Sequence, residues 1–249
     1  MQYKKTTYRL KFLLPFSLLL TLLPIGDLQA QRHNNRQVIR AYPSIGFTAS
    51  QIRGDELKGF KKFGLTAGVG ALVSLTDNEM WSLSLEANYV ERGSFNNTND
   101  PYSITGLALR YVDIPLGFHF TDPYGGMTIG TGLIYSRLVQ QPHGQIYYTP
   151  NYFEPDSSDM SFLKNDFSAF IDFRFTFWRG LTLNVRFQHS LIPIKKDWHF
   201  TEYSSLFAGG SRTWANDLYN SSVSVRILYV FGEPLKAKKV NKKKPMKRR

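Results

Sequence analysis

Hydrophobic and polar residues alternate along much of this 249-residue chain. Residues 181–188 alternate without exception, and residues 81–89 set Trp81 and every second residue up to Tyr89 against polar neighbours. Because successive side chains of a strand point to opposite faces, a sustained period of two predicts β-strands. Eight strands are expected, at residues 40–52, 60–75, 80–92, 104–120, 126–139, 165–177, 181–192 and 220–231.

The connections between these strands alternate in length. Short turns are expected at 76–79, 122–125 and 178–180, and longer loops at 93–103, 140–164 and 193–219. An even number of strands with alternating short and long connections is typical of a small outer-membrane barrel, whose short turns face the periplasm. The pattern therefore predicts an all-β fold, an eight-stranded antiparallel up-and-down transmembrane β-barrel.

The apolar phase changes within the expected strand 104–120. Leu109 and Tyr111 occupy odd positions, whereas Ile114 and Leu116 occupy even ones. One extra residue in a strand moves the following side chains to the other face. We therefore expect a β-bulge near Tyr111–Asp113, with all these apolar side chains on the same face.

Alternation alone fits two kinds of barrel: a lipocalin-like carrier with its apolar face inward, or an outer-membrane barrel with that face toward lipid. The long strands favour the second kind, as does the high aromatic content of 15%. Glycines on the polar face would relieve crowding in a narrow lumen; they are Gly68, Gly70, Gly130 and Gly132. Aromatic residues near strand ends would form the interfacial girdles: Trp81, Tyr89, Tyr111, Tyr135, Phe177, Tyr229 and Phe231.

With the apolar face outward, the polar face lines the lumen. Charges in a narrow interior of low dielectric must be paired. We therefore expect a carboxylate–guanidinium network that plugs the barrel, rather than an open ion pathway, since eight strands leave room only for side chains. Its expected members are Glu86, Arg110, Asp113, Asp172, Arg174, Arg186 and Arg226.

The formal net charge of +12 is concentrated at the two ends of the chain. Residues 1–30 carry three of these charges and residues 233–249 carry eight. Residues 1–30 combine a basic start, an apolar stretch from Phe12 to Ile25 and a small residue at Ala30, which predicts a signal peptide cleaved after Ala30. The predicted organisation is a signal peptide (1–30), an N-terminal arm (31–39), a barrel in the cell outer membrane (40–231) and a basic tail (232–249).

The predicted tail lies in the periplasm, because an even number of strands returns the chain to the side from which it entered. A run of like charges does not fold by itself. The tail is either a solvated segment or an electrostatic tether to an anionic partner such as peptidoglycan or an acidic envelope protein. Nucleic acid is excluded by the compartment. The basic residues are Lys236, Lys238, Lys239, Lys242, Lys243, Lys244, Lys247, Arg248 and Arg249.

Candidate chemistry is sparse. The chain has no cysteine, and its histidines show no metal-ligand spacing, so no cofactor or metal is expected. His189 and Ser190 superficially resemble the His/Ser pair of lipid A deacylases, but adjacent residues of a strand point to opposite faces. We therefore predict no enzymatic activity, with a lipid-modifying barrel enzyme as the alternative.

Aromatic residues in the long loops offer a binding surface, or they pack on one another. The principal ones are Tyr147, Tyr148, Tyr152, Trp198 and Trp214.

Two neighbouring stretches, 83–94 and 107–120, resemble the PorT-like outer-membrane β-barrel family of Bacteroidetes. The matching residues are Glu86, Tyr89 and Gly93, and then Leu109, Tyr111, Ile114, Pro115 and Leu116. The resemblance implies an eight-stranded barrel surrounded by outer-membrane lipid. It also implies a non-catalytic accessory role in protein secretion of the type IX kind or in envelope organisation, with secretion-machinery or other envelope proteins as partners. A lipid-modifying enzyme and an exported carrier are the alternatives.

Overall fold

The computed structural model describes residues 38–55, 57, 59–97, 104–123, 126–140, 154–155, 161–178, 180–203 and 211–231. The predicted signal peptide, nearly all of the arm and all of the basic tail lie outside these ranges. Within them, no helix is long and apolar enough to cross a membrane.

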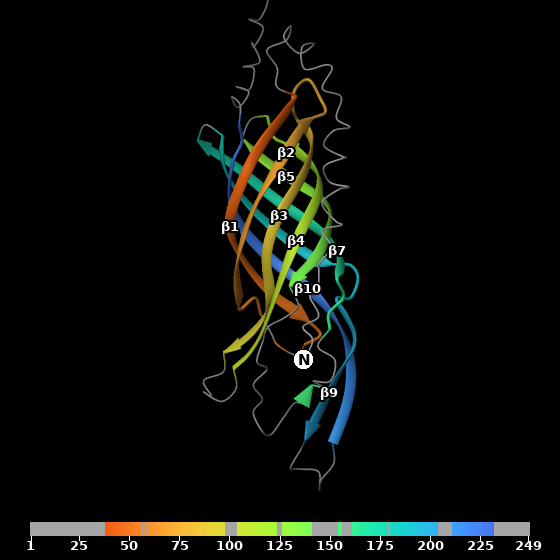
Figure 1. Ribbon diagram of the computed structural model, residues 1–249. Coiled ribbons are helices and arrows are strands. Elements are labelled where there is room, and N and C mark those ends of the chain that lie inside the picture. Colours follow the sequence, from red (N-terminus) through yellow and green to blue (C-terminus); the bar gives the residue numbers. More distant parts are fainter. Residues whose placement is uncertain are drawn as a thin grey trace, which may run out of the picture. The chain divides into compact units, whose positions relative to one another are not determined.

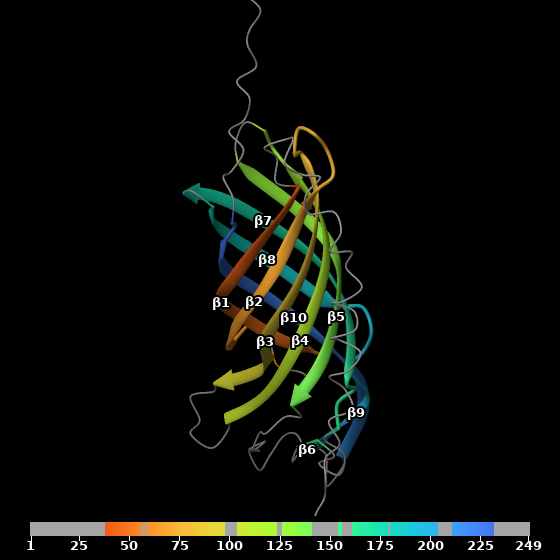
Figure 2. The ribbon, with the colours of Figure 1, turned by 45° about the horizontal axis from the view of Figure 1, so that its top comes forward.

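Eight of the described strands close into an antiparallel barrel (Figures 1 and 2). They are β1 (Ile39–Arg53), β2 (Lys62–Ser74), β3 (Trp81–Asn97), β4 (Ile104–Thr121), β5 (Met127–Gln140), β7 (Asn165–Trp178), β8 (Leu181–Ser190) and β10 (Ser211–Tyr229). Each pairs with the next, and β1 closes the barrel by pairing with β10 from Ser44↔Leu228 to Arg53↔Tyr219. The predicted fold class is confirmed, and all eight expected strands are present.

The last strand is longer than expected. Its second part, from Tyr219, pairs with β1 and β8, whereas its first part pairs with β9 (Lys195–Tyr203). A two-residue strand, β6 (Glu154–Pro155), pairs with the other edge of β9. These three segments form a sheet that continues beyond the barrel wall (Figure 2). We call this sheet the extension; the prediction that 193–219 is a loop was wrong.

The barrel turns its apolar face outward and its polar face into the lumen, as an outer-membrane barrel requires. Large apolar side chains cover the outside, with Ile45 67% and Leu133 61% exposed, while the inward Glu86 is only 2% exposed. A soluble carrier with an apolar lumen would show the opposite arrangement. The outer wall is therefore built to contact lipid, and the lumen is polar.

Strand β4 corrects three predictions. Its inward and outward positions alternate without interruption from Leu109 to His119, so no bulge moves the apolar side chains to one face. Leu109 and Tyr111 are fully buried inside the barrel, and Tyr111 is not a girdle residue. Arg110 consequently points outward, with 48% of its side chain exposed, and is not part of the lumen. The pairing irregularity lies between Arg110 and Tyr111 opposite β5, where Val139 is the extra residue.

An apolar cluster closes the end of the lumen that the extension continues. Leu109 and Tyr111 belong to this cluster, which we call the cap. Its other buried members are Ile52, Leu138, Phe162, Ile194, Trp198 and Leu218. Trp198 is therefore a packed residue of β9, and Trp214 of β10 packs against the same cluster. For these two residues the structure supports packing rather than an open binding surface.

Inward glycines make room for the polar side chains of the lumen. A Cβ on Gly130 would collide with the His119 ring and the Asp172 carboxylate, and one on Gly70 would lie 2.6 Å from Cζ of Tyr42. An interior of eight strands is just wide enough for its own side chains. These glycines therefore allow larger polar groups from neighbouring strands to meet near the barrel axis.

Candidate functional site: the charged lumen

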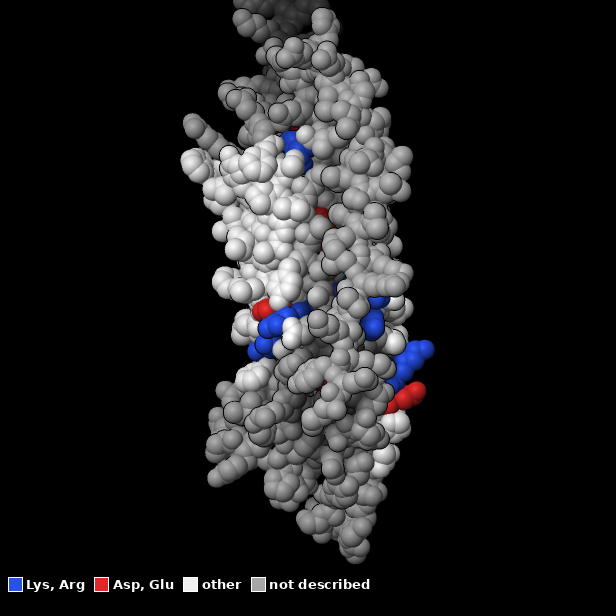
Figure 3. All heavy atoms as spheres, viewed as in Figure 1, with Lys and Arg blue, Asp and Glu red and all other residues white. Residues whose placement is uncertain are grey.

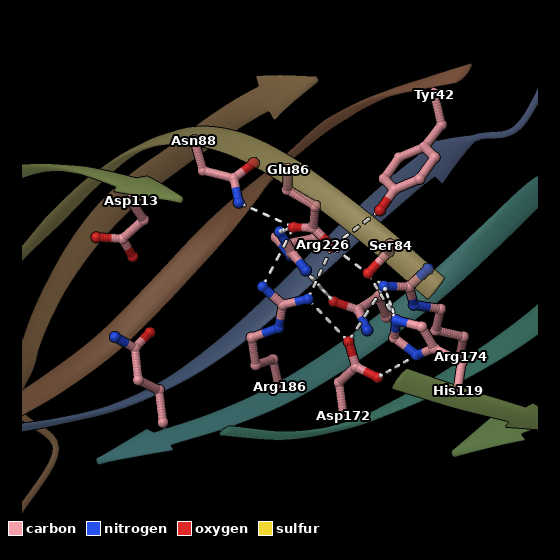
Figure 4. A network of polar contacts seen from close by, with 12 residues as sticks. Tyr42, Ser84, Glu86, Asn88, Asp113, His119, Asp172, Arg174, Arg186 and Arg226 are labelled. Carbon is pink, nitrogen blue, oxygen red and sulfur yellow. Dashed lines mark hydrogen bonds and ion pairs between the residues drawn. The ribbon is translucent and has the colours of Figure 1, made fainter. Parts of the chain in front are cut away.

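Glu86 of β3 is the centre of a network of polar contacts in the lumen (Figure 4). Its Oε1 accepts hydrogen bonds from Arg186 at 2.8 Å and Arg174 at 3.1 Å, and its Oε2 accepts from Arg226 at 2.9 Å and Arg186 at 3.2 Å. The tyrosine hydroxyl of Tyr42 donates to the same carboxylate at 2.9 Å. Arg186 thus binds Glu86 with two nitrogens, the geometry that makes arginine–carboxylate pairs strong and directional.

Asp172 of β7 supplies the second carboxylate of this group. Its Oδ2 lies 2.8 Å from Arg186 and 3.3 Å from Arg174, so both arginines bridge the two acids. The guanidinium of Arg186 also lies over the ring of Phe170, 4.1 Å from its centroid. A planar guanidinium tolerates an aromatic face better than an ammonium does, which explains arginine at this crowded position.

A Ser–His–Asp arrangement adjoins this group. Ser84 Oγ lies 2.7 Å from Nε2 of His119, and Nδ1 of His119 lies 3.4 Å from Oδ1 of Asp172. Ser84 is 1% exposed and His119 is fully buried, and Arg174 also contacts His119 Nε2 at 3.2 Å. The Ser84–His119 distance fits a nucleophile and its base, whereas Nδ1 of His119 and Oδ1 of Asp172 are close but not hydrogen-bonded, and the serine is enclosed by the lumen.

A second group of charges lies between the first and the cap. Arg92 of β3 pairs with Asp113, donates to Gln188 at 2.9 Å and lies 4.0 Å from Asp166. Asp166 accepts hydrogen bonds from Ser190 at 2.8 Å and from Asn220 at 3.2 Å. The side chain of Asn220 also contacts the Tyr111 hydroxyl, which joins this group to the cap.

The buried charges of the lumen balance. Among the described residues that line it, four arginines (Arg92, Arg174, Arg186 and Arg226) face four carboxylates (Glu86, Asp113, Asp166 and Asp172). Pairing of this kind offsets the cost of removing charges from water. Chemically, the arrangement fixes the strands to one another across the lumen.

The structure brings together five of the seven predicted network residues: Glu86, Asp172, Arg174, Arg186 and Arg226. Asp113 joins the second group instead, and Arg110 lies on the outside. The analysis of the sequence missed Tyr42, Arg92, His119 and Asp166. For Arg92 a signal was present, because it is an even-numbered residue of the same strand as Glu86 and so shares its face.

The other candidates take different places. His189 lies in β8 and contacts Ser221 at 2.7 Å, whereas the neighbouring Ser190 points inward to Asp166. The pair thus points to opposite faces, as expected. Tyr147, Tyr148, Tyr152 and the nine basic tail residues lie outside the described residues. In the described part of the chain, no group of three His, Asp or Glu side chains could hold a metal ion.

Comparisons with known proteins give a likeness of fold only. No family model and no curated protein matches the chain. Among solved structures, the outer membrane protein Ail of Yersinia pestis is similar with a TM-score of 0.40 and 12% identity, over 77% of this chain and 99% of Ail. OprG from Pseudomonas aeruginosa is similar with a TM-score of 0.33 and 12% identity, over 77% of this chain and 94% of OprG.

The closed topology, the apolar outer wall and the polar lumen define the class. A membrane-spanning segment must satisfy its backbone hydrogen bonds internally, and a closed barrel does so. The protein is an outer-membrane β-barrel that contacts lipid through its outer wall.

Proposed function

We propose that this protein is a non-catalytic accessory barrel of the cell envelope, acting in protein secretion of the type IX kind or in envelope organisation. The observation that carries the proposal is the filled lumen. Paired buried charges occupy it, and the cap closes one end. A barrel built in this way serves as an anchor for surfaces at its two ends rather than as a conduit.

The extension is the first of these working surfaces. It consists of β9, the first part of β10 and β6, and it is held to the barrel by the packing of Trp198 and Leu218 in the cap. The long connections of such barrels face outward from the cell. A projecting sheet there presents a docking surface for a partner protein.

The basic tail is the second surface. Its nine Lys and Arg residues follow β10 in the sequence, and an even number of strands would return them to the periplasm. An anionic partner such as peptidoglycan or an acidic envelope protein fits this charge.

The likeness to the PorT-like family supports the secretion role only indirectly. In the structure, Glu86 of the shared motif is the centre of the lumen network, and Leu109 and Tyr111 belong to the cap. These residues build the barrel, and a fold does not fix a function. The secretion role therefore depends on a partner being found.

Affinity purification from detergent-solubilised outer membranes tests the role. The bait is the internally tagged protein, with and without residues 233–249. Recovery of secretion or envelope proteins that are lost with the tail would support the accessory role. A barrel that elutes alone in both samples would contradict it.

A serine hydrolase is the second candidate, favoured by the spacing of Ser84, His119 and Asp172. A fluorophosphonate probe on the folded, detergent-solubilised protein tests it. Labelling that disappears in Ser84→Ala would establish a reactive serine. No labelling of the folded barrel would remove this candidate.

A further inference from the structure

Basic side chains gather at one boundary of the apolar outer wall. In the view of Figure 3, blue side chains lie along the lower edge of the uncharged surface, with an acidic side chain among them. Three exposed basic residues come from consecutive strands of the barrel, on the side of the long connections: Arg110 of β4, Arg137 of β5 and Lys164, which directly precedes β7. We call these three residues the basic rim.

The register places the residues of the basic rim on neighbouring strands, on the same side of the apolar wall. Arg137 pairs with Val112, two residues from Arg110 on β4, and on its other side it pairs with Asn165, which follows Lys164. Across the bulge at Val139, Arg110 pairs with Gln140, three residues beyond Arg137 on β5, and both arginines point to the outer face of these neighbouring strands. The cationic side chains are all exposed.

Within the part of the chain that the structure describes, the charge of the basic rim is only partly compensated. Arg137 donates to the neutral amide oxygen of Asn165 at 2.5 Å, and Arg110 donates to that of Gln140. Glu91 contacts Arg110 at 3.5 Å. A guanidinium has five N–H donors, so, as far as contacts with the described residues go, both arginines retain donors for a further anion.

Directly beside the basic rim, the wall is aromatic and apolar. Tyr135 lies two residues before Arg137 and packs against Phe167, with the ring centroids 5.3 Å apart. The hydroxyl of Tyr135 donates to Asn165, the residue that also binds Arg137. Further along β5, Leu133 is 61% exposed on the same face. The surface thus places the basic rim directly beside an apolar wall.

The opposite boundary of the wall differs. Arg40, near the start of β1, is already paired with Glu79 at 3.5 Å, and Asp77 and Asp122 lie in the turns at that end. The open positive charge is therefore on the side of the long connections, which faces the outer leaflet.

We propose that the basic rim binds the phosphate of a phosphorylated glycolipid of the outer leaflet, whose acyl chains lie against Leu133, Tyr135 and Phe167. Arginine recognises phosphate with paired N–H donors, and the adjoining wall removes acyl chains from water. This goes beyond the accessory role and does not depend on it, because lipid binding can be measured on the purified barrel alone.

The test reconstitutes the full mature protein in phosphatidylcholine nanodiscs that contain diphosphoryl lipid A. Native mass spectrometry then counts the lipid A molecules retained after transfer to detergent. We expect retention about tenfold above that of dephosphorylated lipid A, and a similar loss in the double variant Arg110→Gln/Arg137→Gln. Equal retention of the dephosphorylated lipid, or an unchanged double variant, would overturn the proposal.

Two further variants separate this site from general attraction of anions. Arg53→Gln removes an exposed arginine at the end of β1, which β2, β3 and β4 separate from β5, and should leave retention unchanged. Glu91→Gln keeps every basic residue and should increase retention. If Arg53→Gln weakens binding as much as the double variant, or if phosphatidylglycerol competes as well as lipid A does, the specific site is contradicted.

Discussion

Glu86 holds three arginines at once, and Asp172 is the other acid of the same group. The substitution Glu86→Gln keeps the size of the side chain but leaves three buried cations with one carboxylate. Removing one partner of a buried pair costs about 3–5 kcal/mol. We expect a loss of this size in the free energy of unfolding, measured by urea titration of the protein in lipid vesicles with tryptophan fluorescence.

Glu91→Gln is the matched control for this prediction. Glu91 lies on the outside of the same strand, and its contact with Arg110 is exposed. Exposed ion pairs contribute about 0–1 kcal/mol, so the control should unfold almost as the wild type does. Equal losses in the two variants would mean that the lumen network does not stabilise the barrel.

Gly130 gives a second prediction at the level of single residues. An added Cβ would collide with His119 and Asp172, both fixed by other contacts. Overpacking of this kind costs about 1–3 kcal/mol, and we expect Gly130→Ala to lower the free energy of unfolding accordingly. At Gly106 a Cβ would meet only the ring of Phe95, 3.3 Å from its nearest carbon, so Gly106→Ala should cost less. The reverse order would contradict the proposed crowding of the lumen.

Alternation in the sequence was sufficient to place most lumen residues, because parity fixes the face of each side chain. It failed for Arg110 and Tyr111, where we assumed that apolar residues face lipid along the whole strand. Strand β4 continues past the apolar wall, and there Leu109 and Tyr111 pack inward in the cap. Burial in a local core, rather than contact with lipid, decides the direction of these side chains.

Among the secondary-structure elements, the eight barrel strands were predictable and the extension was not. A barrel strand carries a long period of two because one face meets lipid and the other meets the lumen. Strand β9 lacks that regular contrast, since Lys195 and Trp198 are both buried against the cap while Lys196 and Asp197 are exposed. Its stability comes from pairing with β10 and from tertiary packing, which a period does not reveal.

Packing in the cap should therefore stabilise the extension against local opening. Trp198 is 8% exposed and packs against Phe162, with ring centroids 6.0 Å apart. Truncating a buried tryptophan costs about 3–5 kcal/mol, and here the loss should fall mainly on local opening. We expect Trp198→Ala to accelerate amide hydrogen exchange in β9 and in residues 211–216 of β10, with little change in β1–β5.

The control for this prediction is Trp178→Ala. Trp178 is 60% exposed at the other end of the barrel, so its removal leaves no buried cavity. Faster amide exchange throughout the barrel in Trp198→Ala would show that the extension and the barrel open as one unit. Packing in the cap would then stabilise the whole barrel and not the extension alone.

At the scale of the whole molecule, the two faces of the wall obey opposite rules. Inside, a charge is tolerated where a partner across the lumen meets it, as Arg226 meets Glu86 at 2.9 Å. Outside, the hydrocarbon of the membrane offers no partner, so the same charge costs more free energy the deeper it lies in the membrane. In a membrane barrel the cost of an outward charge therefore depends on its depth in the membrane. A soluble barrel with the same strands would show no such dependence.

Strand β5 allows this distinction to be tested with two substitutions on one face. Leu133 lies in the middle of the strand and Val139 near its end beyond Arg137, and they are 61% and 62% exposed. In a bilayer, Leu133→Arg should cost about 2–4 kcal/mol and Val139→Arg about 0–1 kcal/mol. Urea unfolding from lipid vesicles measures both. In water, side chains of equal exposure would tolerate arginine equally, so equal costs would contradict the assignment of this wall to lipid.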